Sequence, residues 1–221
     1  PVVHGLPLAQ TPRPDKAKRE RERAGRTRFT KRAFDESMNG KNMISTLTAD
    51  CVWGAYLEEP CRRVIEIDER DSLYGLHLAI QAAVNFDNDH PFEFYAARTV
   101  RSRPRFCLGS EAVEMGLGGI SSHLDRDMAW LAGFGFDKPP ARHLAALQWA
   151  ARLARMDDPP LCEIYPLPER LKLYYWFDFG DDWKFEIKKA RHPKPPERRV
   201  KYPRVIEKVG PNPVQYPNLD E

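Results

Sequence analysis

The sequence predicts an α+β fold: a mixed or antiparallel sheet, one helix packed on it, a helical insertion and an extended basic N-terminal arm. Residues 171–190, LKLYYWFDFGDDWKFEIKKA, carry most of this prediction because apolar and polar side chains alternate on both sides of Gly180-Asp181-Asp182. Alternation with period two is typical of strands, and Gly and Asp favour the turn between them. A β-hairpin rich in aromatic residues is therefore expected at the centre of the sheet.

The second observation is the order of elements in residues 46–97. Alternating side chains predict strands over 46–57, 61–67 and 91–97. Before the third of these, Asp71-Ser72 is followed by apolar residues at helical spacing, which predicts a capped helix with one buried face. The order strand, strand, helix, strand, completed by the later hairpin, describes a sheet with a helix against one face.

The rest of the chain divides by composition. Residues 1–45 are predicted to be a basic N-terminal extension, and 46–97 the first half of the α+β domain. Residues 98–170 are predicted to be a helical insertion, with an amphipathic helix in 139–156. Residues 171–221 form the second half of the domain: the hairpin and a proline-rich C-terminal strap, which includes a possible short edge strand.

Composition excludes several classes of protein. No apolar run approaches the ~18–20 residues needed to cross a bilayer, and the start of the sequence lacks the apolar core of a signal peptide. The four cysteines lie far apart without metal-binding or disulfide spacing, so reduced thiols are expected. We therefore expect an intracellular protein of the cytoplasm or an organellar matrix, without membrane association and without a cofactor.

The net charge of +3 hides a segregation of charge. Residues 11–34 hold ten Lys and Arg against three acids, and 188–208 hold nine against two, so each carries +7 and the rest −11. Arginine-rich segments favour phosphate groups because the guanidinium fork matches their oxygens. The hypothesis is a non-catalytic accessory or architectural protein that docks on nucleic acid or a ribonucleoprotein. The expected phosphate contacts are Arg19, Arg21, Arg23, Arg26, Arg28, Lys188, Lys189, Arg191, Arg198 and Arg199.

Two other interpretations of the basic segments stay open. The arm could serve only as a charged tail that keeps the chain in solution. Alternatively, the arm and the helix in 139–156 could dock on protein partners in a larger assembly without touching nucleic acid.

An acidic cluster offers an enzymatic alternative. Asp87, Asp89, His90, Asp178 and Asp181 would converge if the third strand lies beside the hairpin, and they would present oxygen ligands and one imidazole to a metal. Such a set would suit a metal-dependent hydrolase or nuclease. The favoured interpretation is structural, with the aspartates in turns and the histidine packed at a strand start. The sequence also lacks a P-loop and a G-x-S-x-G serine, which favours a non-catalytic role.

Two further groups of residues have both a structural and a functional interpretation. His77 lies on the apolar face of the predicted helix, which indicates a core histidine with satisfied hydrogen bonds. Tyr174, Tyr175, Trp176 and Trp183 could form a platform on which bases stack, as in single-strand binders. Core packing is the favoured interpretation for most of these rings.

Three motifs carry a family resemblance: PCRRVIEIDERDSLYGLHLAIQAAVNFDNDHPFEF, LYYWFDFGDDWKFEIKK and YPRVIEKVGPNPVQYP. Together they resemble the plasmid pRi open-reading-frame-three-like family, also labelled insertion-element passenger TnpR-like proteins. The most specific motif is Asp178, Phe179, Gly180, Asp181, Asp182 and Trp183. The resemblance implies an α+β fold with a ubiquitin-like start, and no defined activity. This chain departs from the family in its longer linker, its basic arm and in Phe185, where members often carry a histidine.

Overall fold

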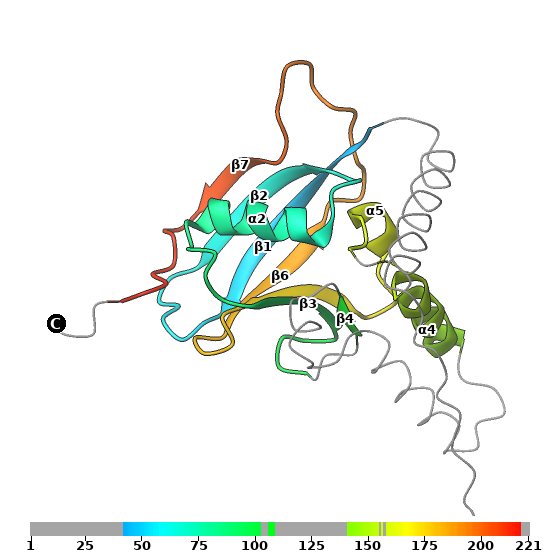
Figure 1. Cartoon of the computed structure of the whole chain (residues 1–221), viewed down its shortest axis with the longest axis horizontal. Coiled ribbons are helices and arrows are strands. Elements are labelled where there is room, and N and C mark those ends of the chain that lie inside the picture. The colour runs from blue at the N-terminus through cyan, green and yellow to red at the C-terminus, as the bar shows by residue number, and fades with distance from the viewer. Residues whose placement is uncertain (1–41, 103–105, 109–140, 155, 157, 218–221) are drawn as a thin grey trace, which may run out of the picture. The chain divides into compact units, whose positions relative to one another are not determined.

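In the computed structural model of the chain, the described residues are 42–102, 106–108, 141–154, 156 and 158–217. They form one seven-stranded sheet (Figure 1). Its strands are β1 Ile44–Trp53, β2 Cys61–Asp68, β3 Phe92–Ala97, β4 Phe106–Leu108, β5 Lys172–Phe177, β6 Trp183–Lys189 and β7 Arg204–Val209. The basic arm lies outside the described residues, so the prediction for it stays a prediction.

The strand order across the sheet is β4-β3-β5-β6-β1-β2-β7, and every ladder is antiparallel. The predicted hairpin is confirmed, since β5 pairs with β6 and the two lie at the centre of the order. The α+β class and the antiparallel sheet are confirmed as well. The ubiquitin-like start is not confirmed, because β3 joins the sheet through β5 and lies apart from β1 and β2.

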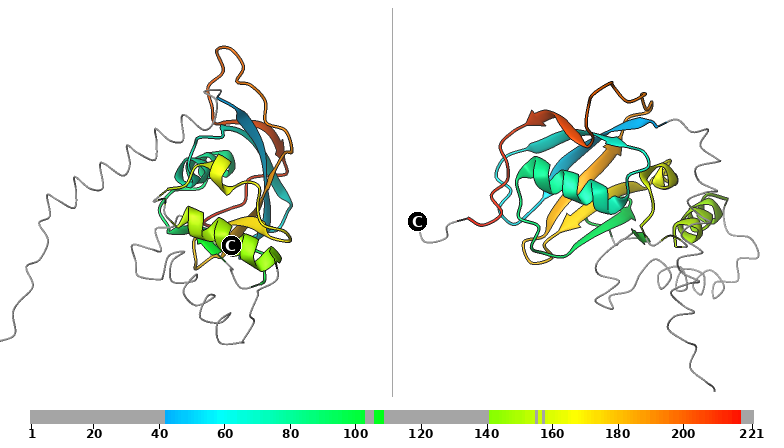
Figure 2. Two further views of the ribbon diagram at one scale, coloured as in Figure 1. Left: turned by 90° about the vertical axis from the view of Figure 1, so that its right-hand side faces the viewer. Right: turned by 45° about the horizontal axis from the view of Figure 1, so that its top comes forward.

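Helix α2, Leu73–Val84, lies across one face of the sheet, as Figures 1 and 2 show. It starts where the sequence predicts, because Ser72 Oγ accepts a hydrogen bond from the Gly75 amide at 3.2 Å. It ends at Asn85, whose φ of 58° is left-handed. Among the described residues, no helix covers the opposite face of the sheet (Figure 2).

The segment predicted as a helical insertion also supplies a strand. Helix α4, Ala141–Leu153, confirms the predicted amphipathic helix, and α5, Leu161–Ile164, follows it. Strand β4, however, pairs with β3 and forms an edge of the sheet. Trp149 of α4 packs on Phe106 of β4, with ring centroids 5.8 Å apart, and donates a hydrogen bond to Ile164 O. None of the helices in the described ranges is long and apolar enough to cross a membrane.

The core lies between α2 and the sheet and is rich in aromatic rings. Tyr175, Phe177 and Phe185 are buried there with Trp183. Gly54, just after β1, lies against Trp183: a Cβ on this glycine would stand 2.2 Å from Cε3 of the indole. The close approach therefore requires glycine at this position.

The C-terminal strap is fixed by a buried arginine, Arg63 of β2, which is 1% exposed. Its Nε donates to Ala83 O at the end of α2, at 3.1 Å. One of its two terminal nitrogens donates to Arg62 O, the carbonyl of the preceding residue. Together the two nitrogens also donate to four oxygens of the C-terminal segment: Val209 O, Gly210 O, Pro211 O and Asn212 Oδ1. Helix end and strap are thus joined through one guanidinium, whose charge is compensated by carbonyl dipoles.

Candidate functional site

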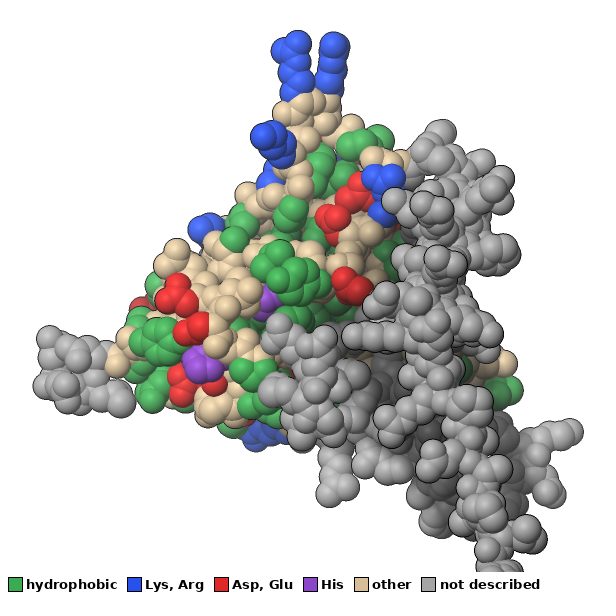
Figure 3. All heavy atoms as spheres, viewed as in Figure 1, with side chains coloured by type: hydrophobic (Ala, Val, Ile, Leu, Met, Phe, Trp, Pro, Cys, Tyr) green, Lys and Arg blue, Asp and Glu red, His purple; other side chains and the backbone are tan. Residues whose placement is uncertain are grey.

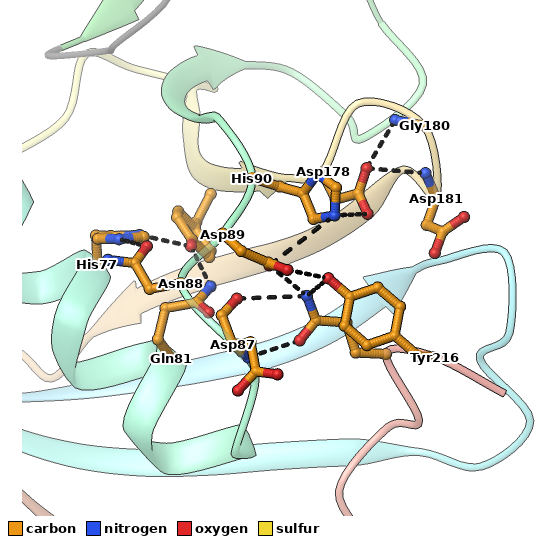
Figure 4. Close-up of polar contacts among 12 residues, drawn as sticks. His77, Gln81, Asp87, Asn88, Asp89, His90, Asp178, Gly180, Asp181 and Tyr216 are labelled. Atoms are coloured by element: carbon orange, nitrogen blue, oxygen red, sulfur yellow. Dashed lines mark hydrogen bonds and ion pairs between the residues drawn. The ribbon is translucent and has the colours of Figure 1, made fainter.

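The residues of the predicted acidic cluster come together only in part (Figure 4). His90 Nε2 lies 3.6 Å from Asp178 Oδ2 and 3.9 Å from Asp89 Oδ1. The carboxylates of Asp87 and Asp181 point away from this centre (Figure 4). In the described part of the chain, no group of three or more His, Cys, Asp or Glu side chains is arranged to hold a metal ion. The geometry gives the enzymatic alternative no support.

Asp178 has a structural task in the hairpin turn. Its Oδ1 accepts hydrogen bonds from the amides of Gly180, at 3.0 Å, and Asp181, at 3.3 Å. Its own φ of 52° and that of Asp182, 59°, are left-handed, a conformation that Asp tolerates better than most residues. The motif from Asp178 to Trp183 therefore encodes a tight turn followed by a core tryptophan, as the structural interpretation predicted.

The strap closes over the loop after α2 through two adjacent residues. Gln215 is buried; it accepts from the Asp87 amide at 2.7 Å and donates to Asp89 Oδ1 at 3.1 Å. The Tyr216 hydroxyl donates to the other carboxylate oxygen of Asp89 at 2.5 Å. This hydrogen bond lowers the pKa of Asp89 and raises that of Tyr216 to about 12. At neutral pH the Asp89 carboxylate is therefore charged and the Tyr216 hydroxyl is protonated. In these states the hydroxyl donates to the carboxylate and fixes the strap to the loop.

His77 is a core histidine, as predicted. Its Nδ1 lies 2.7 Å from the Tyr175 hydroxyl and its Nε2 lies 2.7 Å from Asn88 Oδ1, and its ring stacks on Phe92 at 3.7 Å. Because the Asn88 oxygen can only accept, Nε2 carries the proton and Nδ1 accepts from Tyr175. Burial lowers the pKa of His77 to about 4, so the ring is neutral at physiological pH.

The second basic segment divides into internally paired and outward-facing cations. Lys188 Nζ lies 2.9 Å from Asp50, and Lys189 Nζ lies 2.6 Å from Glu69. These two lysines, expected to contact phosphate, are engaged within the fold. Arg191, Arg198 and Arg199 are instead exposed, on the chain between β6 and β7. In the ranges that the structure describes they form no ion pair.

The basic loop, residues 190–203, is anchored to the sheet by ion pairs with Glu66. Glu66 of β2, with a side chain 4% exposed, pairs with Lys194 and Arg204 at 2.7 Å each, and both cations also contact Glu197. Burial alone would raise the pKa of Glu66, but the hydrogen bonds from Lys194 and Arg204 outweigh it and the pKa is lowered. Lys and Arg side chains project from this loop at the top of Figure 3.

The aromatic side chains of the hairpin divide between the two faces of the sheet. Tyr175 and Trp183 belong to the main core, so the single stacking platform suggested by sequence does not form. Tyr174 and Trp176 lie on the opposite face with Tyr95 of β3. Alternation along a strand places neighbours on opposite faces, which is why adjacent rings cannot share one surface.

Sequence reasoning missed several residues that the fold brings into these sites. Glu66, Gln215 and Asn88 are polar residues without a distinctive local pattern, and their partners lie far away in the chain. The buried glutamate did leave one signal: it stands in a strand between apolar neighbours, where a charge needs a partner.

The structure defines the class of protein: an α+β domain built on an antiparallel sheet. Its most specific sequence motif, from Asp178 to Trp183, forms a turn of that sheet. The family follows from the match of the plasmid pRiA4b ORF-3-like protein family to residues 55–215, so the chain belongs to that family. Among solved structures, the chain is similar to a protein of unknown function, MM3350, from Methanosarcina mazei Go1. The similarity has 17% identity and a TM-score of 0.45, and covers 76% of this chain and 70% of the other. No curated protein matches the chain significantly.

Proposed function

We propose that the chain is a non-catalytic accessory protein that docks on nucleic acid, alone or within a ribonucleoprotein, through the basic loop. The observation that carries this proposal is the separation of roles within the loop. Lys194 and Arg204 fix its base on Glu66, while Arg191, Arg198 and Arg199 are exposed and, among the described residues, have no ion-pair partner. Cations that are not neutralised within the fold are available to phosphate.

The arm belongs to the same proposal. Arg19, Arg21, Arg23, Arg26 and Arg28 would add phosphate contacts from a second segment of high positive charge. Two separate basic segments on a chain whose remainder is acidic favour a partner with a long run of negative charge, because the acidic remainder repels it elsewhere. We leave Lys188 and Lys189 out of this proposal, because each already pairs with an acidic side chain of the fold, Asp50 and Glu69 respectively.

The test measures binding of the full chain to labelled single-stranded and duplex oligonucleotides across a salt series. We expect affinity to fall steeply with salt, and the substitutions Arg191→Gln, Arg198→Gln and Arg199→Gln together to lower the magnitude of the log–log salt slope by roughly 2 to 3. The control removes three cations that are engaged elsewhere, with Arg62→Gln, Lys172→Gln and Lys188→Gln, and should leave the slope close to that of the wild type. A wild-type chain whose binding does not depend on salt, or equal slopes for both triple variants, would contradict the proposal.

A further inference from the structure

A groove opens on the face of the sheet that lies opposite α2. Its volume is about 350 Å³, within the range of small-ligand sites. Strands β1, β3, β5 and β6 and the segment after β3 contribute its lining, which includes Trp53, Tyr95, Arg101, Trp176 and Lys184. These residues come from four regions of the chain, so only the fold brings them together.

Two tryptophans give the groove aromatic walls. Trp53 is 39% exposed, and the guanidinium of Arg101 lies 4.9 Å from the centre of its ring. Trp176 is partly buried, and Lys184 Nζ lies 4.6 Å from the centre of its ring. Each wall thus combines a flat π-surface with a long cationic side chain packed on it.

Two residues of the groove lining carry buried hydrogen-bond donors that lack partners. The hydroxyl of Tyr95, a residue only 1% exposed, and the indole Nε1 of Trp176 are buried and have no hydrogen-bond partner among the described residues. A buried donor without an acceptor costs about 1–3 kcal/mol, so such groups point to a ligand that supplies one. An acceptor atom of a ligand that reaches the Tyr95 hydroxyl would remove this cost.

The charge of the groove narrows the ligand further. Asp182 pairs with Lys184 at 2.7 Å, which leaves Arg101 as the cation without a carboxylate partner in the groove lining. Burial, followed by the nearby charges of Tyr174 and Asp182, raises the pKa of Tyr95, so its hydroxyl is a donor throughout the physiological range. The groove therefore suits a planar ring with acceptor atoms on its edge and one attached anionic group.

We propose that this groove binds a nucleobase of single-stranded nucleic acid, with Trp53 and Trp176 stacking on the ring and Arg101 contacting the adjoining phosphate. A base within a duplex is stacked on its neighbours and cannot enter a groove of this kind, which is why the occupant is single-stranded. This site lies on other residues than the basic loop, and the inference does not depend on the docking proposed above.

The test uses the full chain and short labelled single-stranded oligonucleotides, at a salt concentration high enough to suppress binding through the many cations of the basic loop and arm. Trp176→Ala should weaken binding roughly 10- to 100-fold, as expected for the loss of one base stack. Tyr95→Phe removes only the unpartnered hydroxyl; it should weaken binding roughly three- to tenfold while leaving the stability unchanged or raised. Tyr74→Ala, an exposed ring on α2 and the other face of the sheet, is the matched control and should bind like the wild type.

Each result bears on the proposal separately from the docking function. The loop variant with Arg191, Arg198 and Arg199 replaced should still bind the short strand at high salt, even if it no longer binds long nucleic acid. Equal binding by the wild type, Trp176→Ala and Tyr95→Phe would overturn the groove, as would no binding by the wild type. A free nucleoside monophosphate that binds as tightly as the oligonucleotide, or a blunt duplex that does so, would overturn the assignment to single strands.

Discussion

Replacing Arg63 with Met tests whether one buried guanidinium holds the strap to the body of the protein. Methionine keeps an apolar stem of similar shape at this position but removes the guanidinium and therefore every donor. Six hydrogen bonds are lost at once, to oxygens at the end of α2, on β2 and along the strap. The adjacent Arg62 provides the contrast, because its side chain is exposed and pairs with the carboxylate of Asp50.

The size of the effect follows from burial. The bond to Ala83 O is fully buried, and the other five are partly buried, so water can replace some of them. Counting the buried bond and one of the others in full, at about 1.5–3 kcal/mol each for a charged donor, gives a loss of about 3–6 kcal/mol in the free energy of unfolding. Arg63→Lys should recover little, because three donors on one nitrogen cannot reach both Ala83 and the strap.

The measurement is chemical denaturation followed by circular dichroism, combined with limited proteolysis of the strap. We expect Arg63→Met to lower the denaturation midpoint strongly and to expose residues 210–217 to cleavage, while Arg62→Gln behaves like the wild type. Gly210 accepts one of the Arg63 hydrogen bonds and must be glycine, because its φ is 74° and a Cβ would stand 1.8 Å from Pro60 O. An Arg63→Met variant within about 1 kcal/mol of the wild type, with a protected strap, would refute the reasoning.

Three further predictions rest on single contacts. Gly54→Ala should destabilise the protein by about 1–3 kcal/mol in thermal or chemical unfolding, because the new methyl group overlaps buried Trp183. The control is Gly75→Ala in α2, where a methyl group meets ordinary contacts and should be neutral or stabilising. Equal effects of the two substitutions would argue against the overlap. His77 must be neutral in the fold, so its contribution to the free energy of unfolding is complete above its unfolded pKa of about 6.5. That contribution is lost as the pH falls toward the folded pKa of about 4. The free energy of unfolding should therefore be lower at pH 5.5 than at pH 7.5, by an amount on the order of 1 kcal/mol, and His77→Gln should abolish this difference. Glu66→Gln should weaken the brace of the basic loop and speed tryptic cleavage after Arg198 and Arg199, and an unchanged cleavage rate would show that the loop is held by other contacts.

Local pattern determined the elements themselves. The alternation in 171–190, the Ser72 cap and the turn residues from Asp178 to Asp182 each act within a few residues of one another, so the sequence alone predicts hairpin, helix and turn. The family motifs are predictable for the same reason, because the turn that Asp178 makes is closed by its own neighbours. Strand β4 was missed because three residues are too few to show a period.

Partnership across the chain was decided only by the tertiary structure. Lys188 and Arg199 have the same charge in the sequence, yet the pairing of β6 with β1 sets the first against Asp50, while the loop carries the second into solvent. Likewise, Trp53, Tyr95 and Trp176 become one groove only because β3, β5, β6 and β1 are consecutive in the sheet. The sequence by itself determined which residues form strands, helices and turns, since those preferences act over short distances. Which charges are neutralised and which rings meet depends on contacts between residues far apart in the chain, and only the folded sheet fixes them.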